Sequence, residues 1–120
     1  MKVLTIDDNP LNLKLLSAML EPHGHQVLTV STPASAVSAA LEFRPDIILL
    51  DIAMPGRDGI QVMHDLRARQ ELKATPIHAL TALAMEGLQQ HVAPDGFTSI
   101  IRKPCGKERL LALVEDAALG

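Results

Sequence analysis

Short apolar runs alternate with longer amphipathic stretches along the whole chain. The runs have the length and residue types of β-strands, whereas the stretches between them repeat apolar residues with the period of a helix. This pattern predicts strands at residues 2–6, 26–30, 46–50, 76–80 and 98–102. Residues 47–50 are apolar at every position, which is typical of a central strand buried on both faces of a parallel sheet.

A helix is predicted after each strand. Pro10 suits the first position of a helix, with Asp8 or Asn9 as its cap. The predicted helices cover about residues 10–21, 33–43, 59–70 and 84–92 and a final stretch around Leu110, Leu111, Val114 and Ala118. The helix 84–92 is expected to be the least stable, because Gly87 lies inside it and Pro94 soon follows.

Strands that alternate with helices in this way predict an α/β fold. Crossovers of this length join parallel strands, so a five-stranded parallel sheet should lie between two layers of helices as a (βα)5 three-layer sandwich. The 120 residues are the usual size of one domain, and we expect a single domain over residues 1–120.

The composition excludes several classes of function. The formal net charge of −3 argues against nonspecific nucleic-acid binding. The single cysteine cannot form an internal disulfide and fits a reducing compartment, so we expect a cytoplasmic protein. No apolar run is long enough to span a membrane, and we expect no membrane insertion.

Charged and hydroxyl side chains follow the predicted strands. Asp7 and Asp8 come after the first strand, Asp51 after the third, Thr81 after the fourth and Lys103 after the fifth. Parallel α/β sheets keep their sites at the carboxyl ends of the strands. If the first and third strands are neighbours, Asp7, Asp8 and Asp51 lie within a few ångströms of one another and cannot all ionise at low cost unless a cation enters, and Mg²⁺ prefers such oxygen ligands. The pattern therefore predicts a magnesium site at this edge.

The same groups suit phosphoryl transfer. A metal ion, the Lys103 ammonium and the Thr81 hydroxyl would neutralise and position a transferring phosphoryl group. Asp51 is then the natural nucleophile and would form an acyl phosphate. An acid at the end of a strand can also serve only as a helix cap. For Asp8 alone, capping is as good an explanation as a functional site. For all five groups together, a functional site is the much better explanation.

Four segments together resemble a known family. Residues 7–9, 51–59, 80–82 and 103–104 match, in order and spacing, the motifs of the receiver domains of two-component response regulators. The resemblance covers nearly all of the chain. It implies the flavodoxin-like strand order 2-1-3-4-5 for the sheet. It also implies a signalling switch controlled by phosphorylation.

The resemblance further implies roles for individual residues. Asp51 would accept a phosphoryl group from a phosphohistidine on a histidine kinase or a histidine phosphotransfer protein. Asp8, Asp51 and the backbone carbonyl of Ala53 would bind Mg²⁺, with Asp7 acting through a water molecule. Lys103 would pair first with Asp51 and then with the phosphoryl oxygens.

The switching step departs from the family pattern. The resemblance implies that Thr81 bonds the phosphoryl group in the modified domain and that a cis peptide joins residues 103 and 104. An aromatic residue usually stands three positions before the lysine, where this chain has Ile100. We expect movement of the helix 84–92, with Gly87 inside it, to replace the aromatic relay. Segments 8–16 and 81–87 are similar both to single-domain regulators of the bacterial cell-cycle type and to receivers of hybrid kinases.

The leading interpretation is a switch that is modified once, then slowly dephosphorylates itself, and is not a turnover enzyme. Its downstream protein target would contact the helix 84–92, the strand 98–102 and the last helix. One alternative is an aspartate-nucleophile phosphohydrolase of the haloacid-dehalogenase type, although that family needs Asp-x-Asp after its first strand. Another is a flavin-binding module, but the acids at residues 7 and 8 would repel a flavin phosphate.

Overall fold

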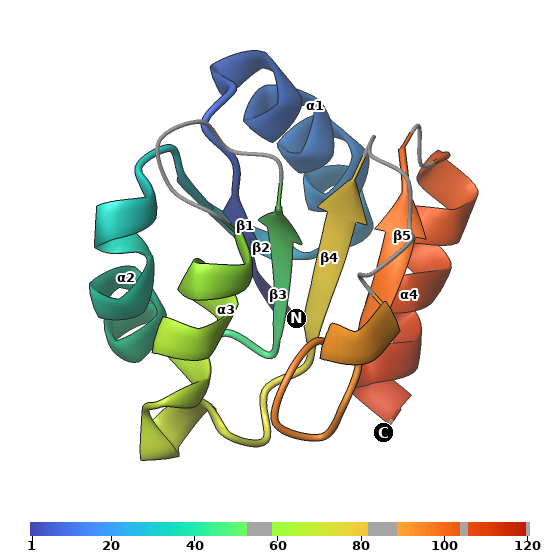
Figure 1. Cartoon of the computed structure of the whole chain (residues 1–120). Coiled ribbons are helices and arrows are strands. Elements are labelled where there is room, and N and C mark those ends of the chain that lie inside the picture. Colours follow the sequence, from blue (N-terminus) through green and yellow to red (C-terminus); the bar gives the residue numbers. More distant parts are fainter. Residues whose placement is uncertain (53–58, 82–88, 104–105, 120) are drawn as a thin grey trace.

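A five-stranded parallel sheet with helices on both faces forms the domain in a computed structural model, which describes residues 1–52, 59–81, 89–103 and 106–119 (Figure 1). The strands are β1 (Lys2–Ile6), β2 (Gln26–Val30), β3 (Ile47–Asp51), β4 (Ile77–Thr81) and β5 (Ser99–Arg102). The helices are α1 (Pro10–Leu20), α2 (Ala36–Phe43), α3 (Gly59–Arg67) and α4 (Lys107–Leu119). The strand order is β2-β1-β3-β4-β5, which confirms the predicted order 2-1-3-4-5.

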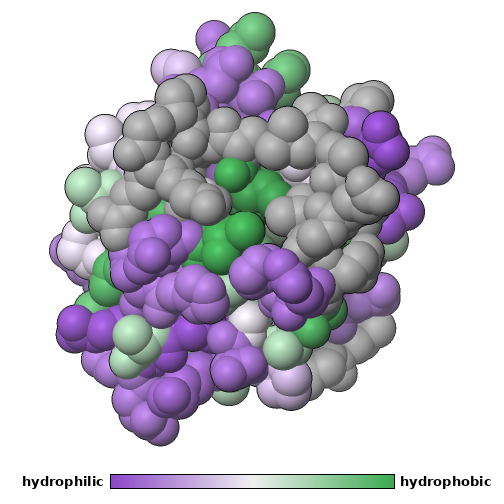
Figure 2. Space-filling view, in the orientation of Figure 1, coloured by the Kyte–Doolittle hydropathy of each residue, from purple (hydrophilic) through white to green (hydrophobic). Residues whose placement is uncertain are grey.

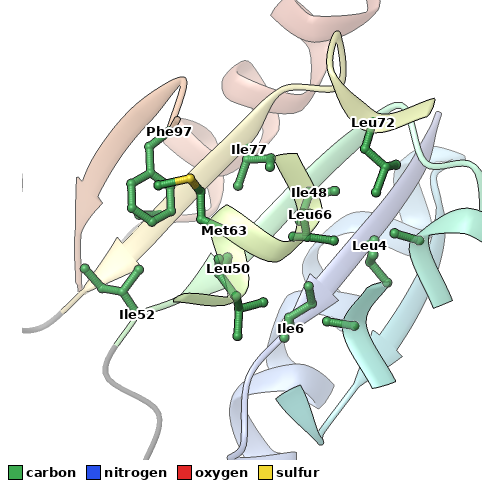
Figure 3. Close-up of a cluster of buried hydrophobic side chains, with 14 of the residues drawn as sticks. Leu4, Ile6, Ile48, Leu50, Ile52, Met63, Leu66, Leu72, Ile77 and Phe97 are labelled. Carbon is green, nitrogen blue, oxygen red and sulfur yellow. The ribbon is translucent and has the colours of Figure 1, made fainter. Parts of the chain in front are cut away.

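Alternate residues of the strands face two separate hydrophobic clusters. Helices α2 and α3 cover one face, where even-numbered residues of β1 and β3 contact Ala40 and Leu66. Helices α1 and α4 cover the other, where odd-numbered residues of the same strands contact Leu20 and Val114. Figure 3 shows part of the first cluster, with Met63 and the ring of Phe97 at its β5 end. The period-two alternation of buried residues is what fixes the sheet in the middle layer.

The first helix begins as the sequence predicts. Asn9 has an extended backbone and its Oδ1 accepts a hydrogen bond from the backbone N–H of Leu11, while Pro10 takes the first helical position. Gly24, with φ of 88°, ends the 3₁₀ turn that follows α1 and reverses the chain into β2. Local residue chemistry thus places α1 directly after the end of β1.

Two helices are shorter than predicted. Residues 33–35 form a 3₁₀ turn rather than the start of α2, and residues 70–72 form another after α3 has ended at Arg67. The side chain of Arg67 binds carbonyl oxygens of the segment 72–75, which holds that segment in a non-helical path. The predicted helix 84–92 lies mostly outside the described residues; of its end, residues 89–91 form a 3₁₀ turn.

Glycine allows one close backbone approach beside the site. A Cβ atom added to Gly59 would lie 2.2 Å from Cα of Ile52, which is far inside any real contact. The Gly59 backbone N–H also donates to the carbonyl of Ile52. The start of α3 therefore rests directly on the backbone that follows Asp51.

Hydrophilic residues cover most of the lower part of this side of the molecule, and hydrophobic residues show at its centre (Figure 2).

Candidate functional site

Asp7 is held at the carboxyl edge of the sheet by hydrogen bonds to its backbone and to both carboxylate oxygens. It follows β1 directly, and its backbone N–H donates to the carbonyl of Val30 on the neighbouring strand. Its Oδ1 accepts from the backbone N–H of Asn9 at 3.0 Å, and its Oδ2 accepts from Asn12 Nδ2 at 3.2 Å. Only 2% of the residue is exposed. The loop and the first turn of α1 therefore hold both carboxylate oxygens.

Asp8 and Asp51 complete a group of three carboxylates. Asp51 is the last residue of β3 and is buried, while Asp8 is the most exposed of the three. One carboxylate oxygen from each residue lies within 4.8 Å of the others. Strands β1 and β3 are neighbours in the sheet, which is why acids separated by more than forty positions meet here. The sequence-based prediction that the three acids lie together agrees with this geometry.

Lys103 provides the positive charge of the site. Its Nζ lies 3.3 Å from Asp51 Oδ2 and 3.5 Å from Asp7 Oδ2, and its side chain is 25% exposed. Its backbone N–H donates to the carbonyl of Thr81 at 2.7 Å, which joins the end of β5 to the end of β4. Thr81 is fully buried at that end. The fold thus brings all the predicted side chains of the site to one edge.

The charge of this group favours a divalent cation. Three carboxylates and one ammonium give this group of side chains a net negative charge. Carboxylate oxygens are hard ligands, and Mg²⁺ binds such ligands while it keeps several waters. The exposure of Asp8 leaves access from solvent. The donor set therefore fits magnesium.

Some predicted positions lie outside the described residues. These are the backbone carbonyl of Ala53, Gly87 and the peptide bond between residues 103 and 104. One contributor was missed by the sequence analysis: Asn12, which holds Asp7 from the first turn of α1. The sequence could have indicated Asn12 by its position three residues after the helix cap Asn9, because side chains in a helix tilt toward its N-terminus and thus toward the end of the preceding strand.

The chain matches the family described as the response regulator receiver domain over residues 3–115. The chain belongs to this family. It is 34% identical over 119 residues to protein PilH of Pseudomonas aeruginosa, a match that covers 99% of this receiver domain and 98% of PilH. It is 33% identical over 114 residues to the polar-differentiation response regulator DivK of Brucella anthropi, covering 95% and 93% of the two chains.

Solved structures agree with the family match. The chemotaxis protein CheY4 of Vibrio cholerae superposes with a TM-score of 0.89 at 29% identity, covering 97% of each chain. The receiver domain of the sensor histidine kinase PA1611 of Pseudomonas aeruginosa superposes with a TM-score of 0.87 at 30% identity, covering 99% and 98%. That structure has a magnesium ion coordinated in its active-site cleft.

Membership decides the class of function. Receiver domains are switches of two-component systems that accept a phosphoryl group on an aspartate, bind Mg²⁺ at an acidic pocket and act with histidine kinases and downstream targets. The haloacid-dehalogenase alternative is not supported by these matches. None of the helices in the described residues has both the length and the apolar character needed to cross a membrane.

Proposed function

We propose that Asp51 is the residue that accepts the phosphoryl group, within a receiver domain formed by residues 1–120. The observation that carries this proposal is the position of Asp51 between two kinds of charge. It stands at the end of the central strand β3, 3.3 Å from the Lys103 ammonium and next to the carboxylates of Asp7 and Asp8. Asp7 is already held by two hydrogen bonds from the protein, and Asp8 is not at the end of a buried strand.

The proposed reaction is a transfer from a phosphohistidine. A carboxylate oxygen of Asp51 attacks phosphorus, an O–P bond forms, and the N–P bond breaks as the imidazole of the donor leaves. Lys103 neutralises charge on the phosphoryl oxygens, and the Thr81 hydroxyl donates to one of them after a change of rotamer. Water later removes the phosphoryl group slowly, so the domain is a switch and not a turnover enzyme.

Magnesium would be held by Asp8, Asp51 and the backbone carbonyl of Ala53, with Asp7 acting through water. When bound there, it supplies positive charge to the oxygens of the transferring group. Support for this ligand set comes from the three clustered carboxylates and from the magnesium ion in the related receiver domain of PA1611.

The phosphodonor is proposed to dock over α1. Leu11 and Leu15 are 63% and 49% exposed and lie one helical turn apart, directly after the loop that holds Asp7 and Asp8. Exposed apolar side chains at the centre of a surface are the kind that a protein partner covers, and we propose that the histidine kinase or histidine phosphotransfer protein covers this pair. The downstream target is proposed to bind at the helix 84–92, β5 and α4, and the protein is proposed to act in the cytoplasm.

The switching step is proposed to proceed without an aromatic relay. Ile100, at the usual aromatic position, is 8% exposed and belongs to the hydrophobic cluster between the sheet and α2 and α3. An isoleucine at this position has no ring to exchange between solvent and core. We therefore propose that the segment 84–92 moves when the Thr81 hydroxyl bonds the phosphoryl group. Unchanged amide exchange in residues 82–95 on beryllofluoride binding would contradict it.

The test of the acceptor is an intact mass after incubation with acetyl phosphate and Mg²⁺. We expect one added phosphoryl group, dependent on Mg²⁺, in the unchanged protein and none in Asp51→Asn. Asp65→Asn, on the remote surface of α3, is the matched control and should be modified like the unchanged protein. An adduct that persists in Asp51→Asn would refute the assignment. Repeated hydrolysis of a phosphomonoester would refute the proposal that the domain is only a switch.

The docking proposal has its own test. Leu11→Lys combined with Leu15→Lys should slow transfer from a phosphorylated histidine kinase by about tenfold or more, because two exposed apolar contacts are lost and charge is introduced. Modification by acetyl phosphate should be unchanged, since α1 does not contact so small a donor. Equal loss with both donors would show damage to the site and contradict a docking role.

A further inference from the structure

A cavity lies at the amino edge of the sheet, opposite the carboxylate site. Its volume is about 510 Å³, and its walls are the segment before β4 and the segment before β5. In Figure 1 these are the yellow and orange loops near the bottom of the molecule. The residues that matter for its chemistry are Arg67, Lys73, Val92, Pro94 and Thr98. Nothing in the receiver reaction uses them.

Arg67 is a fixed positive charge at this cavity. Its Nε donates to the carbonyl of Gly96 at 2.9 Å. Its Nη1 donates to the carbonyls of Leu72, Lys73 and Thr75 at 2.8, 3.2 and 2.7 Å. The residue is 8% exposed, and burial lowers the pKa of its guanidinium, although arginine keeps its proton in proteins. The charge is therefore held in one place by neutral partners that do not cancel it.

One nitrogen of this guanidinium is left over. Nη2 makes no hydrogen bond or ion pair to the part of the chain that the structure describes. Among the described residues, the side-chain nitrogens that are fully buried and have no hydrogen-bond partner are the two ring nitrogens of His25. Nη2 of Arg67 is not one of them, so it is in contact with solvent. Since Nε and Nη1 are directed at carbonyls, Nη2 is the guanidinium nitrogen that remains for a ligand at the cavity that Arg67 lines.

Two more polar groups line the same cavity. Lys73 is exposed and places an ammonium on the same wall. Thr98 Oγ1 accepts a hydrogen bond from the backbone N–H of Ile77, so its own proton is available to a ligand. Val92, 38% exposed, and Pro94 supply an apolar wall. Most ligand pockets combine such an apolar lining with a few convergent polar groups.

We propose that this cavity binds a small organic anion. A carboxylate or phosphate group would accept hydrogen bonds from Arg67 Nη2 and Thr98 and pair with Lys73, and an apolar body would lie on Val92 and Pro94. Asp95 is the opposing charge: it acts on the pKa of Arg67 in the direction that favours the cation, yet it does not line the cavity. It would weaken the binding of an anion without blocking it.

The test is a titration followed by amide chemical shifts in magnesium-free buffer, with hexanoate as the probe. Hexan-1-ol tests the apolar body alone, and inorganic phosphate tests the anionic group alone. We expect hexanoate to shift amides of residues 73–77 and 95–98 with saturation and to leave those of Asp7 and Asp51 unmoved. Phosphate should shift the same amides more weakly, and hexan-1-ol should leave them unchanged.

Charge variants make the result specific. Lys73→Ala should weaken hexanoate binding by about threefold and Lys73→Glu by about tenfold, while Asp95→Asn should strengthen it by about twofold. Lys107→Glu on α4 changes the net charge equally and should have no effect. These variants leave Arg67 and its carbonyl bonds in place, so the fold is preserved. Equal shifts by hexanoate and hexan-1-ol, or equal binding by Lys73→Glu and Lys107→Glu, would overturn the proposal.

Discussion

The two edges of the sheet each hold one buried or half-buried cation, and they hold it in opposite ways. At the carboxyl edge, Lys103 stands 3.3 and 3.5 Å from two carboxylate oxygens and is 25% exposed. At the amino edge, Arg67 is 8% exposed and makes hydrogen bonds of 2.7 to 3.2 Å to four carbonyl oxygens. One cation has charged partners at loose distances, and the other has neutral partners at tight distances.

The two cations have different roles because their partners differ. The partners of Lys103 are carboxylates, to which a metal ion or a phosphoryl group can also bind. The ammonium can therefore exchange a carboxylate oxygen for another negatively charged partner. The partners of Arg67 are backbone oxygens of segments 72–75 and 96, which the fold holds in place. Replacement of Lys103 should therefore change metal binding and phosphoryl transfer, whereas replacement of Arg67 should lower the free energy of unfolding.

The largest expected effect is the loss of stability when Arg67 is replaced. Arg67→Ala should lower the free energy of unfolding by about 3–5 kcal/mol, because it leaves buried carbonyls unpaired and opens a cavity. Arg69→Ala, an exposed arginine two residues along, should cost less than about 0.5 kcal/mol. Urea unfolding of both variants measures the difference. If the free energies of unfolding of the two variants agree within about 1 kcal/mol, Arg67 does not hold this edge of the sheet together.

The next effect is a loss of stability in acid. Burial lowers the pKa of His78 to about 4 from an ordinary 6.5, and its Nδ1 lies 2.6 Å from Ser99 Oγ. The unfolded chain takes up a proton as the pH falls through 6.5, and the folded protein does so only near pH 4. The contribution of His78 is therefore complete above pH 6.5 and is lost between there and about pH 4, by about 2 kcal/mol at pH 5.

A comparison of variants isolates this effect. His78→Gln should unfold with a shallower dependence of stability on pH between 7.5 and 5, a range of about 2 kcal/mol in the unchanged protein. His64→Gln, an exposed histidine on α3, should keep the original slope. Burial also lowers the pKa of His25, which acts in the same direction in every variant. A His78→Gln profile parallel to that of the unchanged protein would contradict the assignment.

The two edges also differ in how far the sequence could predict them. Asp7, Asp51 and Lys103 each follow an apolar strand, so the topology alone places them together. Arg67 gives no such signal. It stands in an amphipathic helix where an exposed arginine is the ordinary expectation, and its acceptors lie 5 to 29 positions away on loops that have no pattern of their own. Only tertiary packing selects it.

The helix ends show the same limit. Strands β1 and β2 match their predicted bounds, because apolar runs are bounded by polar residues there. Helix α3 ends before its predicted end because Arg67 binds the following segment through its side chain, an interaction that helical periodicity does not contain. Asn12 was missed for a related reason: its bond to Asp7 depends on how α1 leaves the end of β1.

A smaller effect should appear at the carboxyl edge. Lys103→Met should bind Mg²⁺ about tenfold more tightly, because it removes a positive charge that opposes the metal a few ångströms away. It should also be phosphorylated more slowly by acetyl phosphate, since the ammonium no longer neutralises the transferring group. Thermal unfolding at increasing Mg²⁺ gives the affinity, with Lys107→Met as the control for net charge. Weaker binding in Lys103→Met would mean that the lysine orders the carboxylates more than it repels the metal.

The smallest effect concerns Asn12, and it tests how rigid the acidic site is before a metal arrives. Asn12→Ala removes one hydrogen bond to Asp7 Oδ2, at 3.2 Å, and should lower stability by about 0.5–1 kcal/mol. Asn12→Asp should cost more, because it places a fourth acid beside three. If Mg²⁺ restores both variants to the stability of the unchanged protein, the metal can order Asp7 by itself. If it restores only Asn12→Asp, the protein must hold Asp7 in place, and the carboxyl edge is then built around one fixed acid just as the amino edge is built around one fixed arginine.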